Sequence, residues 1–338
     1  MQLQLITDNM NEGLIVIDKN ALILSVNSYA AKIFSRKEYE VKQKHYSTLT
    51  ENTKFLDAVA KALENNRTSL LIEMNDADYR VFCSPVMKDG LLNGVVILLF
   101  DVTTILQSEK LRREFSANVS HELKTPLTSI NGYAQIITNG IASSEDIPSF
   151  AAKIAKESNR LMILIEDIIR LSNLDESDAP AIRESFAIKE TIIDVISSLQ
   201  EKANSRGITM VCEGTDFFIN ANKSQITELI YNICDNAIKY NKDNGSVTFT
   251  LADATVRIAD TGIGIPSQYT SRIFERFFRV DKSHSKKVDG TGLGLSIAKH
   301  IARQNNIDIS VESEIEKGTA FILTFKDAFR QNPRKKLL

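Results

Sequence analysis

Two stretches of apolar residues, spaced alternately three and four positions apart, constrain the fold of this 338-residue chain most strongly. This spacing forms the seam of an α-helix that packs against a partner helix. The first seam consists of Leu123, Leu127, Ile130, Ala134, Ile137 and Ile141. The second consists of Ile147, Phe150, Ile154, Leu161, Leu164, Ile168 and Leu171, with Glu157 as its one polar member. The chain should therefore contain two long helices with buried faces.

The connection between the two seams is short and carries helix stop and start signals. Residues 139–146 contain Gly140, a frequent helix terminator, followed by serines and Asp146, which favour a new start. We therefore expect an antiparallel helical hairpin over residues 104–176. One hairpin has too little apolar surface to close a core, whereas two hairpins form a four-helix bundle, so we expect a homodimer. A solvated helical linker is disfavoured because both seams are strongly apolar.

Residues 1–103 predict a small α/β unit. Strand-like runs at residues 13–18 and 21–26 lie at hairpin distance, a helix-prone stretch covers residues 28–65, and further strand-like runs occupy residues 79–84 and 94–100. The order of strand, strand, helices and three strands resembles a PAS sensor domain, as does the ending at residues 100–103. Any ligand of this domain stays open. His45 could ligate a haem, but a surface histidine is favoured, and Cys83 lacks the setting of a flavin photosensor.

Residues 181–328 alternate between helical and strand-like patterns. Helical patterns cover residues 188–205, 224–240 and 294–304, and strand-like runs cover residues 208–213, 246–251, 255–259, 308–312 and 320–325. This alternation predicts one mixed sheet backed by helices, which is a two-layer α/β sandwich. A polar hinge is expected at residues 175–180, and a frayed basic tail at residues 330–338. The predicted fold class is therefore multidomain α+β.

The composition excludes several classes of protein. With 43% hydrophobic and 25% charged residues and a formal net charge of -2, the chain resembles an ordinary globular protein without a basic field, so no nucleic-acid partner is expected. Its three cysteines form no Cys-x-x-Cys pair, which disfavours a disulfide framework or a zinc site. The best apolar run, residues 91–100, has half of the ~20 residues of a spanning helix. We expect a cytoplasmic chain, linked to a membrane only if the full-length protein carries an upstream anchor.

The first predicted helix carries a histidine in an unusual setting. His121 is followed by Glu122 and, one turn later, by Thr125, which shares its helix face. Pro126 should bend the helix just after the imidazole. A lone helical histidine is more often structural, but these neighbours favour a neutral imidazole that acts as a nucleophile. The segment His121–Leu127 resembles the phosphoacceptor box of bacterial sensor histidine kinases, His-Glu-x-x-Thr/Asn-Pro-Leu, without any departure.

A second cluster of polar residues indicates a nucleotide site. Asn232, Asn236 and Lys239 share one face of the helix at residues 224–240, where asparagine is an unfavourable interior residue. Amide oxygens suit Mg²⁺ and an ammonium suits phosphate, although an exposed polar face is the plain alternative. After a strand come Asp260, Gly262 and Gly264, which suit an adenine amine and tight turns. Further glycines, at positions 290, 292 and 294, open the last helix, where free amides can bind phosphate.

In this order the polar cluster and the glycines resemble the N, G1, F and G2 boxes of the histidine-kinase ATP-binding domain. The resemblance implies that ATP and Mg²⁺ are the cofactors, with Mg²⁺ on Asn236 and Asn232. It also implies that Glu122 takes the imidazole proton or orients the ring, and that Thr125 holds a water for dephosphorylating a response regulator. The segment between Gly264 and Gly290 would be a mobile lid over ATP. The residues that it places around the nucleotide are Asn232, Asn236, Lys239, Tyr240, Asp260, Gly262, Gly264, Arg279, Gly290, Thr291, Gly292, Leu293 and Gly294.

The function implied by these resemblances is that of a two-component sensor histidine kinase. ATP would phosphorylate His121, the phosphoryl group would pass to an aspartate of a response regulator, and phosphatase activity would remove it from the regulator by hydrolysis. Two alternatives are a signalling scaffold that binds nucleotide without transfer and an ATP-driven clamp of the gyrase type. The intact histidine box disfavours the first, and the helical hairpin disfavours the second.

Overall fold

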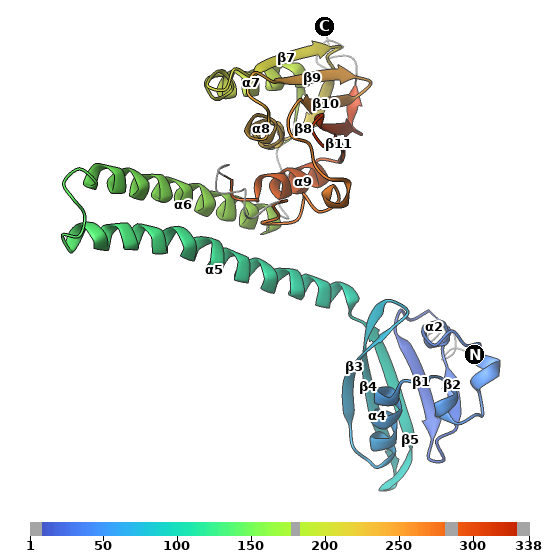
Figure 1. Ribbon diagram of the computed structural model, residues 1–338. Coiled ribbons are helices and arrows are strands. Elements are labelled where there is room, and N and C mark those ends of the chain that lie inside the picture. Colours follow the sequence, from blue (N-terminus) through green and yellow to red (C-terminus); the bar gives the residue numbers. More distant parts are fainter. Residues whose placement is uncertain (1–8, 177–182, 281–289, 330–338) are drawn as a thin grey trace. The chain divides into compact units, whose positions relative to one another are not determined.

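The computed structural model describes residues 9–176, 183–280 and 290–329 (Figure 1). The chain divides into two compact units, residues 1–117 and 118–338. The boundary falls inside a long helix, so this helix belongs partly to each unit. The mixture of sheets and long helices confirms the predicted multidomain α+β class, whereas the domain limits at residues 103, 176 and 181 stay a prediction.

The first unit is a five-stranded antiparallel sheet with helices inserted between its second and third strands. The sheet order is β2-β1-β5-β4-β3. This arrangement confirms the predicted order of two strands, helices and three strands, although the sequence patterns located only four of the five strands and assigned no run to the first strand after the helices. Its elements are β1 (Gly13–Asp18), β2 (Ile23–Val26), α2 (Ser28–Ile33), α3 (Glu38–Val41), η1 (Tyr46–Thr48), α4 (Thr53–Leu63), β3 (Thr68–Met74), β4 (Ala77–Lys88) and β5 (Leu91–Asp101).

The core of this unit lies between one face of the sheet and the helices. Ile15 and Ile17 of β1, Ile97 of β5 and Phe55 of α4 are fully buried. Removal of each such side chain from water contributes about 1.5–3 kcal/mol to the free energy of unfolding. The alternation of buried and half-buried residues along β1 follows the period of two that a strand imposes.

The predicted helical hairpin consists of α5 (Thr103–Thr138) and α6 (Ile147–Glu176). Their connection contains Gly140 with a φ of 68° and Ser143, whose hydroxyl donates to the Asp146 carboxylate at 2.6 Å. The rings of Tyr133 and Phe150 stack across the hairpin with centroids 5.6 Å apart. Helix α5 continues through Pro126. The stop and start signals in the sequence thus lie where the two helices end and begin.

The remainder of the second unit is an α/β sandwich. A mixed sheet of order β11-β12-β10-β9-β7, in which only β7 and β9 run parallel, packs against three helices. The predicted mixed sheet and its three helices are confirmed. The elements are β7 (Thr209–Gly214), β9 (Ser246–Ala252), β10 (Thr255–Asp260), β11 (Ile307–Glu314), β12 (Gly318–Phe325), α7 (Ile188–Asn204), α8 (Lys223–Lys239) and α9 (Gly294–Gln304).

A second, smaller sheet departs from the prediction of one sheet. It has the order β13-β8-β6 and consists of β6 (Glu184–Ala187), β8 (Phe218–Ala221) and β13 (Ala328–Phe329). Strands of two to four residues are too short to show a periodic pattern in the sequence. The short helix η2 (Ser267–Tyr269) follows β10. None of the helices in the described residues combines the length and the apolar character of a membrane-spanning segment.

Candidate functional site

The acceptor candidate His121 projects from α5 into solvent. Its side chain is 79% exposed, and its Nδ1 lies 3.7 Å from Oε1 of Glu122, which is an ion-pair distance and too long for a hydrogen bond. The Thr125 hydroxyl donates to the backbone oxygen of His121 at 3.2 Å. The structure thus places the three residues of the histidine box together, with the imidazole open to an incoming group.

A cavity of about 330 Å³ lies between α8 and the ends of β10 and β12. Asp260 lines this cavity, and its Oδ1 accepts hydrogen bonds from the amides of Gly262 at 2.8 Å and Thr319 at 3.2 Å. Burial raises the pKa of this carboxyl, although the two amide hydrogen bonds lower it. The remaining walls are largely apolar and include Ile265, Ile273 and Phe321. A flat apolar ring with one amine suits this combination of surfaces.

The glycines near Asp260 are required by close backbone approaches. A Cβ atom on Gly262 would lie 2.3 Å from the backbone oxygen of Tyr240. Gly264 has a φ of 71°, and a Cβ there would lie 2.1 Å from the oxygen of Glu314. Any other residue would push the loop out of the cavity wall. The sequence prediction that these glycines permit tight turns is consistent with this geometry.

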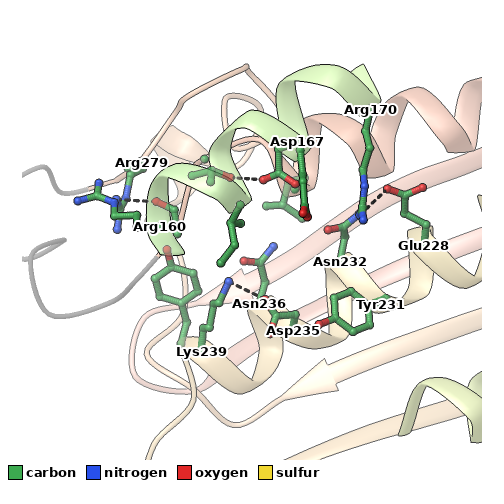
Figure 2. Close-up of a pocket in the computed structure, with 18 of the residues that line it drawn as sticks. Arg160, Asp167, Arg170, Glu228, Tyr231, Asn232, Asp235, Asn236, Lys239 and Arg279 are labelled. Atoms are coloured by element: carbon green, nitrogen blue, oxygen red, sulfur yellow. Dashed lines mark hydrogen bonds and ion pairs between the residues drawn. The ribbon is translucent and has the colours of Figure 1, made fainter. Parts of the chain in front are cut away.

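A larger cavity of about 1180 Å³ adjoins the first and lies between α6, α8 and the loop before α9 (Figure 2). Asn232, Asn236 and Lys239 of α8 all line it, as their shared helix face predicts. Asn236 and Arg279 line both cavities, so a ligand could span the two. Nδ2 of Asn232 is buried and finds no hydrogen-bond partner in the described part of the chain. An unpaired buried amide is costly, which points to a ligand-binding role.

The ammonium group of Lys239 is paired in this arrangement. It lies 2.6 Å from Oδ2 of Asp235 (Figure 2). The other oxygen of Asp235 contacts Lys202 of α7. The sequence did not single out Asp235 or Lys202. The pairing keeps two cations beside the larger cavity, where a phosphate could compete with the carboxylate for both.

The loop that leads into α9 is rich in available backbone amides. The helix begins at Gly294 without a side-chain cap among the described residues, so its first amides can meet an anion. Gly292 has a φ of 74°, and a Cβ there would lie 3.0 Å from the backbone of Phe277. Nη1 of Arg279 donates to the oxygen of Gly290 at 3.0 Å. Of the predicted lid, residues 281–289 lie outside the described residues.

Helix α6 contacts this loop directly, which the sequence did not predict. The hydroxyl of Thr291 donates to Oδ2 of Asp167 at 2.7 Å, and burial raises the pKa of the Asp167 carboxyl. Arg170 lies 3.4 Å from Glu228 of α8 (Figure 2). Asp167 lies among the apolar seam residues of α6, and its partner is 124 positions away. No local pattern in the sequence indicates such a contact.

Three family models match consecutive parts of the chain. The PAS fold matches residues 2–90, and the His Kinase A phospho-acceptor domain matches residues 111–177. The histidine kinase-, DNA gyrase B- and HSP90-like ATPase matches residues 221–328, which supports the use of ATP. The three matches follow the order of the sheet unit, the helical hairpin and the α/β sandwich described above.

Known proteins resemble the chain over nearly its whole length. Sensor protein kinase WalK of Staphylococcus aureus strain Newman is 31% identical over 96% of the chain, and the chain spans 55% of that relative. A second Staphylococcus aureus WalK is also 31% identical, and the chain spans 80% of it. The solved structure of histidine kinase ThkA in complex with response regulator protein TrrA has the same fold, with a TM-score of 0.51, 23% identity and 96% coverage of both chains. With its PAS, phospho-acceptor and ATPase regions in this order, the chain belongs to the sensor histidine kinases of two-component systems.

Proposed function

We propose that the chain is an ATP-dependent protein-histidine kinase that phosphorylates His121 and passes the phosphoryl group to an aspartate of a response regulator. The observation that carries the proposal is the presence, in one compact unit, of an exposed imidazole beside Glu122 and a two-part cavity with Asp260 at its apolar end. The proposed limits are residues 1–103 for the PAS domain, 104–176 for the acceptor hairpin and 181–328 for the ATP-binding domain.

The smaller cavity suits adenine. Both hydrogen bonds to Asp260 end on Oδ1, and none reaches Oδ2 within the described residues, which leaves Oδ2 to accept from the exocyclic amine. The phosphates then extend into the larger cavity, where Lys239 and Arg279 supply positive charge. The residues that we propose to contact the nucleotide are Asn232, Asn236, Lys239, Tyr240, Asp260, Gly262, Gly264, Arg279, Gly290, Thr291, Gly292, Leu293 and Gly294.

Mg²⁺ fits the amide-lined face of α8. Asn236 and Asn232 offer amide oxygens that would hold the ion. The unpaired buried Nδ2 of Asn232 is a donor, so it would donate to an oxygen of the bound nucleotide and not to the cation. When bound, Mg²⁺ neutralises charge on the phosphates. The two asparagines line the larger cavity together with Lys239 and would hold the ion there.

The acceptor chemistry follows from the orientation of the imidazole. Because Nδ1 is the ring nitrogen that faces Glu122, Nε2 is the nitrogen that attacks the γ-phosphorus. A bond between Nε2 and phosphorus forms as the bond between phosphorus and the bridging oxygen breaks, and ADP leaves with the electron pair. Glu122 orients the ring and, once the 3.7 Å separation closes to hydrogen-bond distance in the reactive complex, accepts its Nδ1 proton. The exposure of His121 allows the same nitrogen to meet ATP and then a regulator.

The partners are a response regulator and a second copy of the chain. The exposed side chains of Met162, Ile165 and Ile169 form an apolar stripe along α6, which supports pairing of two hairpins into a four-helix bundle. Thr125 would hold the water that dephosphorylates the regulator. We place the chain in the cytoplasm, as part of a membrane receptor if an anchor precedes it in a longer protein. Light scattering should give twice the chain mass of 37.8 kDa, and a monomer mass at all concentrations would contradict the dimer.

Labelling with γ-labelled ATP and Mg²⁺ tests the reaction. The purified protein should incorporate label that is lost in acid and retained in alkali, because phosphohistidine is acid-labile and hydroxyl phosphoesters are not. The labelled peptide should contain His121. Acid-stable label, or ATP binding without any label, would support the nucleotide-binding scaffold instead.

A further inference from the structure

Glu157 is a charged residue in the apolar seam of α6 and has no part in the function proposed above. Its side chain is 26% exposed, so it lies mostly out of water. Its Oε2 is 3.9 Å from Nη1 of Arg160, one helical turn further on. A partly buried carboxylate is retained at such a position when it holds a partner. The partner here is a guanidinium group that is itself only 34% exposed.

Arg160 also reaches across the hairpin to the histidine box. Its Nη2 lies 3.9 Å from Oε2 of Glu122 on α5. The other oxygen of Glu122, Oε1, is the one that lies 3.7 Å from Nδ1 of His121. The four side chains therefore form a series of successive contacts, from Glu157 to Arg160, then to Glu122 and then to His121. Each terminal nitrogen of the guanidinium faces a different carboxylate.

We propose that Arg160, held by Glu157, is a positioning residue that keeps the Glu122 carboxylate directed at the imidazole of His121. The proposal rests on the proposed kinase function. At 3.9 Å the two ion pairs are longer than hydrogen bonds, so their main effect is on orientation rather than stability. A guanidinium is a rigid planar fork, so fixing one of its ends on Glu157 also fixes the end that faces Glu122. Without it, Glu122 would occupy several rotamers on a helix surface.

A different role for Arg160 must be separated from this one. Arg160 lines the larger cavity, so it could contact the nucleotide directly (Figure 2). Glu157 does not line that cavity. Loss of Glu157 should therefore disturb the positioning of Glu122 while leaving the affinity for nucleotide unchanged, whereas a nucleotide contact by Arg160 alone predicts no effect of Glu157.

The test compares Arg160→Met, Arg160→Lys and Glu157→Gln with the wild-type protein. Arg113→Met is the matched control, because Arg113 makes an exposed ion pair with Glu109 elsewhere on α5. The measurements are kcat and KM for acid-labile labelling of His121, with nucleotide affinity by calorimetry. Arg160→Met should lower kcat by about tenfold or more at unchanged KM, because misplaced catalytic groups lose rate. Arg160→Lys, which keeps the charge without the fork, should recover part of kcat, and Glu157→Gln should lower kcat less than Arg160→Met.

Two outcomes would overturn the proposal. A rise in KM and loss of affinity in Arg160→Met at unchanged kcat would make Arg160 a nucleotide contact. A wild-type kcat and KM in Glu157→Gln, or in Arg160→Met, would show that Arg160 does not position Glu122. If Arg160→Met does not fold, as judged by circular dichroism, the Lys and Gln variants decide the question. Absence of label in the wild-type protein would instead refute the kinase function itself.

Discussion

The proposed acceptor site and the proposed nucleotide site differ in how strongly their surroundings fix them. His121 is 79% exposed, and its Nδ1 stands 3.7 Å from Oε1 of Glu122. Asp260 is partly buried and is held by two backbone amides, and the glycines beside it are packed so closely that a Cβ would collide with backbone. A nucleotide pocket must be preorganised to bind, whereas an acceptor that serves both ATP and a partner protein must be accessible.

The difference predicts that conservative substitutions in the nucleotide site strongly reduce nucleotide affinity. Conservative substitutions on the acceptor helix should have little effect on activity unless they remove the reacting groups. Asp260→Asn keeps the shape of its side chain but replaces the charged acceptor, and one such hydrogen bond corresponds to about a 10- to 100-fold loss of affinity. Comparison of the affinity and the melting temperature of this variant also shows whether the buried carboxylate of Asp260 contributes to nucleotide binding or only to folding.

The largest effect on nucleotide affinity is expected from Asp260→Asn and from Asn236→Ala. Both should reduce nucleotide affinity measured by calorimetry and, with it, labelling from ATP, at unchanged melting temperature. Asp308→Asn is the matched control, because that residue is exposed on β11 in the same domain. Normal affinity in both variants would mean that the cavity beside Asp260 is not the nucleotide site.

A smaller and more selective effect is expected from Thr125→Ala. Dephosphorylation of the cognate regulator should fall by about tenfold while autophosphorylation changes little, since an oriented water contributes at least that much to rate. Thr128→Ala is the matched control, because its hydroxyl also donates to the carbonyl four residues earlier, at 2.8 Å. Stability should change by no more than about 0.5 kcal/mol. Equal losses of both activities would indicate that Thr125 only shapes the helix near Pro126.

A modest effect is expected at the contact between α6 and the loop before α9. Asp167→Ala removes the acceptor for the Thr291 hydroxyl, and amide hydrogen exchange at residues 290–294 should then speed up by about fivefold, the equivalent of one hydrogen bond. Asp167→Asn retains an acceptor and should have a smaller effect. Equal exchange in all three proteins would show that the contact does not hold the loop.

The smallest effect on His121 labelling is expected from modification of the cysteine thiols. Burial raises the pKa of Cys83 to about 11 and that of Cys234 to about 12, so both should resist alkylation in the folded protein. Cys212 is partly exposed and should react first. Mass spectrometry after iodoacetamide treatment at pH 8 checks this order, and labelling of His121 should persist. Early alkylation of Cys234 would contradict the rigid packing of α8.

Sequence patterns predicted the parts of the molecule in which apolar residues recur at a regular spacing or in which a short motif is present. The seams marked the hairpin, and α9 begins and ends at the predicted residues, Gly294 and Gln304. The histidine box and the glycines near Asp260 were recognisable because their chemistry fixes residue types at short spacing. The small sheet β13-β8-β6 was missed because its strands have two to four residues.

Contacts between distant side chains were not predictable in the same way. The Asp167 to Thr291 hydrogen bond and the link from Arg160 to Glu122 join different elements, and neither leaves a local signal in the sequence. The ion pair between Lys239 and Asp235 was also missed, but here a signal existed, because the two residues are four positions apart on a predicted helix and therefore share a face. Glu157 is the exception, because a charge in an apolar seam did mark a place where the structure holds a polar network.

The separation of acceptor from nucleotide site is tested most directly by His121→Gln. Label incorporation from γ-labelled ATP and nucleotide affinity should be measured on the same preparation. The account predicts no acid-labile label and an affinity within about twofold of the wild-type value, because an exposed side chain outside the pocket contributes little to it. Full labelling of this variant would contradict the account.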